Sequence, residues 1–154
     1  MTNNDILRRL RYTFDFNDSK MMTLFALAGY EASREEVCDW LKKDGDDTFK
    51  NCNDKYLATF LNGLIIEKRG RLDGPLPVAE KNLDNNIILK KLKIALNLQA
   101  EDIISLLGSS GLHLSKHELS ALFRKPGHKH YRQCKDQILR NFLQGLQDKH
   151  HAEI

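Results

Sequence analysis

The sequence predicts an all-α protein made of two tandem copies of a four-helix repeat. Residues 3–68 align without a gap on residues 85–150, at a constant offset of 82 positions. Apolar residues in both copies recur every three or four positions, the spacing of one face of a helix, and no stretch alternates convincingly with the period of two that marks a strand. We therefore expect a duplicated helical domain, with the glycine- and proline-rich segment 69–84 as a linker.

The sequence pattern of each copy predicts the same four helices in the same order. The first, about 4–16, has Asn4 as its expected N-cap, and the second, about 18–28, ends before Gly29. The third begins at Ser33, which forms a capping box with Glu36, and the fourth begins near residue 54. The matched pairs include Asn3-Asn4 with Asn85-Asn86, Ser33 and Glu36 with Ser115 and Glu118, and Cys52 and Asp54 with Cys134 and Asp136.

The packing of the copies follows from their small size. A copy of about 66 residues builds only a small core, so we expect the fourth helices to pack together with pseudo-two-fold symmetry. Gly63 and Gly145 lie at equivalent points of these helices, and a close backbone approach between copies would explain them; a fraying last turn is the alternative. Trp40, between Val37 and Leu41, is expected to be buried.

The paired Asn-Asn starts, the Ser-x-x-Glu boxes and the Cys-x-Asp motifs followed by FLNGL or FLQGL resemble the bacterial YehS-like family over essentially the whole chain. The resemblance implies a cytoplasmic bacterial protein with two copies of a helical domain and an unknown biochemical function. It supplies no catalytic residues that could be carried over to this chain.

Composition agrees with a cytoplasmic protein. The chain is 41% hydrophobic and 29% charged, as globular proteins are, and its longest nearly apolar stretch, 21–30, is too short to span a membrane. Three cysteines do not make a disulfide scaffold, and the N-terminus lacks the layout of a secretory signal. We expect no membrane association.

The two copies differ in net charge, and this difference is the strongest indication of function in the sequence. Residues 3–70 contain 11 Lys and Arg against 12 Asp and Glu, whereas residues 85–150 contain 11 against 5. The divergence is sharpest after the third helix, where RKPGHKHYR replaces KKDGDDTFK. Such a basic surface is typical of proteins that bind polyanions. The candidate contacts are Lys116, Arg124, Lys125, His128, Lys129, His130 and Arg132.

The sequence leaves the kind of partner open. The leading hypothesis is a noncatalytic, regulatory binding module for nucleic acid or an acidic protein. Tyr131 would stack on an exposed base or, because it aligns with Phe49, anchor the core. The second and third helices also resemble a helix-turn-helix by length, with Lys116, Arg124 and Lys125 at outward positions of the third. The alternatives are a protein-interaction adaptor with an apolar groove between the repeats and, less favoured, a small-molecule enzyme.

Metal and cofactor signals are weak. His128, His130 and Cys134 form an H-x-H-x3-C pattern, but the first copy has Asp46 and Thr48 where the histidines stand, so we expect no obligate metal. The chain carries no phosphate-cradling glycine loop, nucleophile elbow or metalloprotease helix, and we predict no cofactor and no enzymatic activity. Cys52 and Cys134 are expected to be small buried packing residues.

Overall fold

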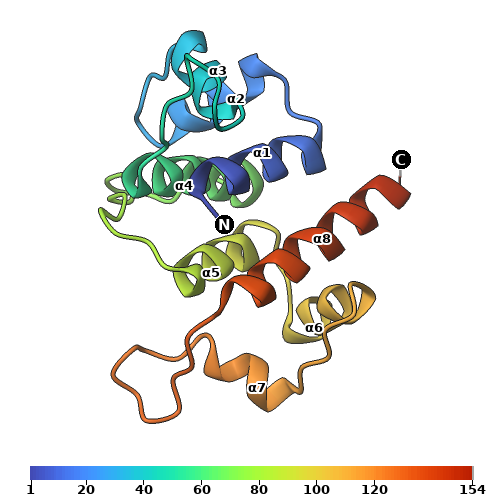
Figure 1. The fold of residues 1–154 in the computed structure, drawn as a ribbon. Coiled ribbons are helices and arrows are strands. Elements are labelled where there is room, and N and C mark those ends of the chain that lie inside the picture. The colour runs from blue at the N-terminus through green and yellow to red at the C-terminus, as the bar shows by residue number, and fades with distance from the viewer. Residues whose placement is uncertain (154) are drawn as a thin grey trace. The chain divides into compact units, whose positions relative to one another are not determined.

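The computed structural model describes residues 1–153, and in this part of the chain it has eight helices and no strand (Figure 1). The helices are α1 (Asn3–Phe14), α2 (Asp18–Leu27), α3 (Arg34–Leu41), α4 (Asp54–Arg69), α5 (Asn85–Ala95), α6 (Ala100–Ser109), α7 (Lys116–Ala121) and α8 (Asp136–Ala152). Met1–Leu83 forms one compact unit, and a second unit begins at Asp84. The all-α prediction and the tandem duplication are confirmed.

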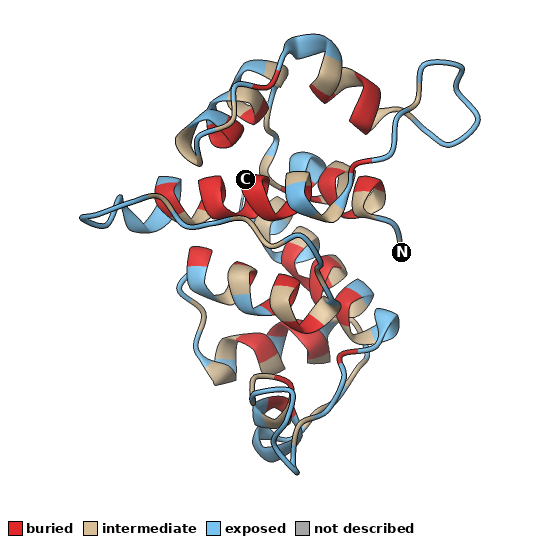
Figure 2. Cartoon of the chain, turned by 90° about the vertical axis from the view of Figure 1, so that its left-hand side faces the viewer, coloured by how far each residue is buried: buried red, intermediate tan, exposed pale blue. Residues whose placement is uncertain are grey.

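The two units bury equivalent positions. Leu10 and Leu92 are fully buried, and so are Phe60 and Phe142. Within each unit the second helix packs against both the fourth and the third helix. Figure 2 shows the buried residues along the helices of each unit and the exposed residues in the connecting loops. The pseudo-two-fold packing of the copies stays a prediction.

Gly63 and Gly145 mark a backbone contact inside each copy. A Cβ at Gly63 would lie 1.7 Å from the carbonyl oxygen of Leu24 on α2, and one at Gly145 would lie 2.2 Å from the carbonyl oxygen of Leu106 on α6. The close approach expected at these glycines therefore exists, but its partner is the second helix of the same copy. The alternative of a fraying turn is wrong, because α4 and α8 continue well past the glycines.

The capping boxes at Ser33 and Ser115 are confirmed, since each serine side chain accepts from the backbone N–H of the glutamate three residues on, at 3.0 Å. The expected cap at Asn4 is wrong. Thr2 caps α1: its hydroxyl accepts from the N–H of Asp5 at 3.1 Å, and the Asp5 carboxylate accepts from the N–H of Thr2 at 2.9 Å. The predicted end near residue 16 is also too late, because Asp15 has a left-handed φ of 54°.

Asn4 is instead buried and closes the loop that follows α3. Its Nδ2 donates to the carbonyls of Trp40 and Lys50, both at 2.8 Å, and its Oδ1 accepts from the N–H of Cys52 at 3.0 Å. Asn86 makes the same three bonds in the second unit, to Leu122, Arg132 and Cys134, each at 2.9 Å. The repeated Asn and Cys positions therefore form the same structural clamp in each copy, and we call these the Asn4 clamp and the Asn86 clamp.

Trp40 is 3% exposed and packs against the rings of Phe25 and Tyr56, at centroid distances of 5.3 and 4.8 Å, so its predicted burial is confirmed. We expect its native fluorescence to lie at a shorter wavelength than that of free tryptophan and to shift to longer wavelength on denaturation. Because Trp40 is the single tryptophan, the emission reports on this site alone. Efficient acrylamide quenching of the native protein would contradict this packing.

Candidate functional site

The segment 124–132, which we call the basic loop, connects α7 to α8 on a fixed backbone scaffold. The Asn86 clamp holds the carbonyls of Leu122 and Arg132, and the N–H of Arg132 donates to the carbonyl of Ala121 at 3.0 Å. Two turns lie between these anchors, closed by the N–H groups of His128 and Tyr131, each at 2.9 Å from its acceptor. The loop is therefore anchored at both ends and exposed at its tip.

The equivalent loop of the first copy, 42–50, has the same scaffold with different charges. Its turns are closed by the N–H groups of Asp46 and Phe49, at 3.2 and 3.0 Å from their acceptors. The Asp46 carboxylate accepts a hydrogen bond from the N–H of Thr48 at 3.0 Å, and this bond lowers the pKa of Asp46. In the second copy, Nδ1 of His128 accepts from the N–H of His130, also at 3.0 Å. The same backbone turns therefore form with acidic side chains in the first copy and with basic side chains in the second.

Four of the side chains in the basic loop are lysines or arginines: Arg124, Lys125, Lys129 and Arg132.

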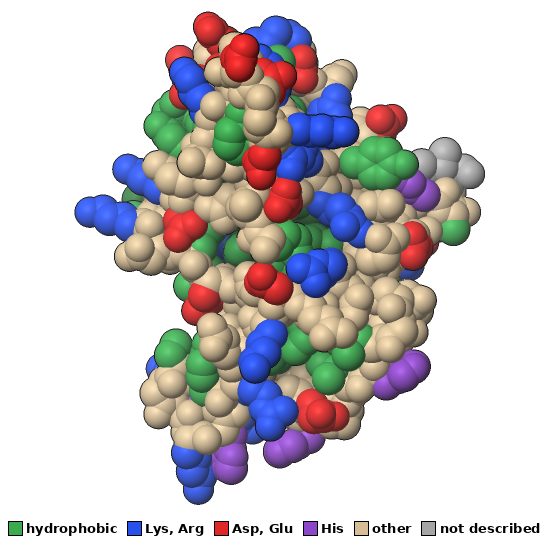
Figure 3. Space-filling model, viewed as in Figure 1, with side chains coloured by type: hydrophobic (Ala, Val, Ile, Leu, Met, Phe, Trp, Pro, Cys, Tyr) green, Lys and Arg blue, Asp and Glu red, His purple; other side chains and the backbone are tan. Residues whose placement is uncertain are grey.

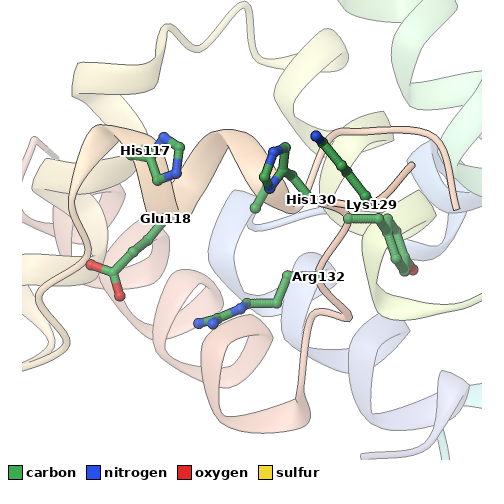
Figure 4. A pocket seen from close by; sticks show the side chains of 7 residues that line it. His117, Glu118, Lys129, His130 and Arg132 are labelled. Carbon is green, nitrogen blue, oxygen red and sulfur yellow. The ribbon is translucent and has the colours of Figure 1, made fainter. Parts of the chain in front are cut away.

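One side of the basic loop forms a hollow of about 320 Å³ with α7 (Figure 4). Lys129, His130 and Arg132 reach it from the loop, and His117 and Glu118 reach it from α7. The Glu118 carboxyl has a lowered pKa, mainly because it accepts from the backbone and hydroxyl of Ser115 and secondarily because Arg132 and His117 lie nearby. The hollow therefore combines two cations, Lys129 and Arg132, and two histidines with one carboxylate. Its lining residues are His117, Glu118, Ala121, Lys129, His130, Tyr131 and Arg132.

Arg124 and Lys125 lie on another side, around a hollow of about 170 Å³ that also includes Lys90 of α5. Lys125 is exposed, but Arg124 is half-buried and its Nε is enclosed without a hydrogen-bond partner. Arg124 is thus less available to a partner than the sequence predicted. Lys90 was not predicted, because its place beside the loop depends on how α5 packs.

Lys116 is the first residue of α7, and its Nζ lies 2.9 Å from Glu101 on α6. Both side chains are exposed, so the ion pair is weak but partly offsets the charge of Lys116. The helix has six residues and ends at Ala121. Arg124 and Lys125 therefore lie beyond it, and the expectation that they project from an outward face of the third helix is wrong.

Tyr131 and Phe49 are both half-buried, and burial raises the pKa of the Tyr131 hydroxyl. Tyr131 therefore combines part of the anchoring role with a partly exposed surface on two hollows. Cys52 and Cys134 are buried, which raises the pKa of each thiol to about 12 and makes both poor nucleophiles.

The structure assembles no metal cluster from the H-x-H-x3-C pattern of the sequence. Within residues 1–153, no three His, Cys, Asp or Glu side chains gather in a way that could hold a metal ion. The helices in the same range are also too short or too polar to cross a membrane.

Together these features define an all-helical tandem-repeat protein in which one copy carries a basic surface loop. Lys, Arg and His side chains gather at the lower end of the second repeat in Figure 3, where Figure 1 places α7 and the loop that follows it.

The chain belongs to the family described as "Protein of unknown function (DUF1456)", whose model matches residues 3–70 and 85–151. It is 42% identical over 154 residues to "Uncharacterized protein YehS" of Escherichia coli (strain K12), covering 99% of both chains. The resemblance to the YehS-like family is confirmed. No solved structure matches the chain.

Proposed function

We propose that this is a noncatalytic binding protein of the cytoplasm whose second repeat holds an anionic macromolecule on the basic loop. The observation that carries the proposal is the comparison of two loops with one scaffold. Asp44, Asp46 and Asp47 of the first copy are replaced by Pro126, His128 and Lys129, although the clamp and both turns are unchanged. Because the first copy forms the same scaffold with acidic residues, a binding role accounts for the basic charges better than a structural one.

The local geometry favours an acidic protein segment over a DNA groove. A recognition helix enters the major groove with several side chains in line, but α7 is short and its Lys116 is paired with Glu101. The cations of the loop are spread over an irregular surface that includes Glu118. Separated cations on an irregular surface suit acidic side chains spaced along a peptide. The three free thiols agree with a reducing compartment.

We expect Lys125→Glu, Lys129→Glu and Arg132→Glu together to weaken binding of an acidic partner at least about tenfold at low salt. For a nucleic acid the change would also lower the slope of log Kd against log salt by roughly 2 to 3, because three phosphate contacts are lost. Anisotropy titrations with labelled polyglutamate, RNA and DNA at several salt concentrations measure both effects. Arg124 is left unchanged because it is half-buried.

The matched control is Lys43→Glu with Lys50→Glu, which reverses the exposed equivalents of Lys125 and Arg132 on the first copy. This variant is expected to keep wild-type affinity. If the wild-type protein binds none of the three polymers in a salt-sensitive manner, the proposed function is wrong. Tight binding of DNA or RNA alone would reverse the preference for an acidic protein.

A further inference from the structure

A third hollow, with a more apolar lining, lies beside the basic loop and includes Arg132 of that loop. Its volume is about 440 Å³, and its lining comes from the segment before α7, from residues 132–135 and from the start of α8. Leu112 and Ile138 form its apolar part, whereas Arg132 and Lys135 supply positive charge. The full lining is Leu112, Arg132, Gln133, Lys135, Gln137 and Ile138, which includes no acidic residue.

The first copy shows what the same place in the fold accommodates. Tyr30 and Tyr56 stand where the second copy has Leu112 and Ile138, and their rings pack with centroids 5.2 Å apart. Tyr56 also packs on Trp40 at 4.8 Å, and Tyr30 donates from its hydroxyl to Glu36 at 2.6 Å. The second copy replaces Trp40 by Leu122. Aliphatic side chains thus stand where the first copy has an aromatic cluster.

We infer that this hollow receives an aromatic side chain of an acidic peptide whose carboxylates contact the basic loop. The inference rests on the proposed function for the carboxylates and adds the chemistry of one anchoring residue. Leu112 and Ile138 offer the aromatic ring an apolar surface, and Arg132 and Lys135 complement acidic residues on either side of it. Arg132 lines both hollows, so one extended peptide reaches both.

The test compares two probes, a labelled polyglutamate peptide with one central phenylalanine and the same peptide with alanine there. The phenylalanine peptide is expected to bind wild-type protein about tenfold more tightly, because its ring leaves water. Leu112→Tyr with Ile138→Tyr restores the residues of the first copy and fills the hollow. This variant is expected to bind both peptides equally, with the affinity that wild type has for the alanine peptide.

Two measurements keep the result interpretable, one on the double tyrosine variant and one on a further variant. The double tyrosine variant retains Glu118, the equivalent of the glutamate that Tyr30 contacts, and its unchanged affinity for the alanine peptide verifies the fold. Ile138→Ser leaves the hollow open but less apolar, and it is expected to reduce the preference for phenylalanine as well.

The outcomes separate this inference from the proposed function. Equal binding of both peptides to wild type, with salt-sensitive affinity, would overturn the aromatic anchor and leave the proposed function standing. A phenylalanine preference that survives in the double tyrosine variant would also overturn it. Binding of RNA or DNA but of neither peptide would overturn the aromatic anchor and would identify the partner as a nucleic acid. No binding at all would overturn both proposals.

Discussion

Gly63→Ala is expected to destabilise the first unit by at least about 3 kcal/mol, although alanine is the better helix former by roughly 1 kcal/mol. The added methyl would lie 1.7 Å from the carbonyl oxygen of Leu24 and 2.6 Å from its carbon. Both atoms are backbone, so no rotamer change relieves the overlap, and α2 must move away from α4. Chemical denaturation followed by circular dichroism measures the loss.

Two other helical glycines give graded controls. Gly145→Ala meets the carbonyl oxygen of Leu106 at 2.2 Å and is expected to be destabilising, but less so than Gly63→Ala. Gly108→Ala meets only the His113 side chain, at 3.6 Å, which is ordinary contact. That change is expected to be neutral or to stabilise the protein by up to about 1 kcal/mol. If Gly63→Ala and Gly108→Ala had the same effect, the backbone contact would not explain the glycine.

The glycines also show how far a sequence can predict this fold. Helical periodicity, the serine capping boxes and the repeat predicted the order of helices, because these are local signals or comparisons of the chain with itself. The reason for Gly63 required knowing which helix faces it. Small core size suggested the other copy, but α2 of the same copy lies there.

The candidate site was predicted in the same partial way. The charge difference between the copies located the basic loop, since it is visible in an alignment of the two halves. Exposure was not visible: Arg124 is half-buried, and Lys116 is paired with an acid fifteen positions earlier. The apolar hollow was missed although its signal was present, as the exchange of Tyr30 and Tyr56 for Leu112 and Ile138 lies in the same alignment.

Asn4 is the clearest wrong prediction from the sequence, and it leads to the second large effect. An asparagine near the start of a helix is typical of a cap, but two asparagines follow Thr2 here and only the threonine occupies the capping position. The side chain of Asn4 is 1% exposed and joins three separate backbone groups. Those partners lie 36 to 48 positions further along the chain, so no local sequence pattern predicts these hydrogen bonds.

Asn4→Ala is expected to reduce the free energy of unfolding by roughly 3 to 5 kcal/mol, because it leaves one backbone N–H and two carbonyls without their partner. Asn4→Asp retains the acceptor but turns a carboxylate oxygen toward the carbonyls of Trp40 and Lys50, so it is expected to be at least as damaging. Asn51→Ala, at an exposed position of the same loop, is the control and is expected to change stability by less than about 0.5 kcal/mol.

The equivalent substitution in the second copy tests whether the clamp holds the basic loop in place. Asn86→Ala removes the bonds to the carbonyls of Leu122 and Arg132 without altering any charge on the loop. We expect a comparable loss of stability, and faster amide hydrogen exchange within 124–134 than in the corresponding segment 42–52 of the same molecule. If Asn86→Ala left the exchange rates within 124–134 at their wild-type values, the asparagine would not be what holds the basic loop in place.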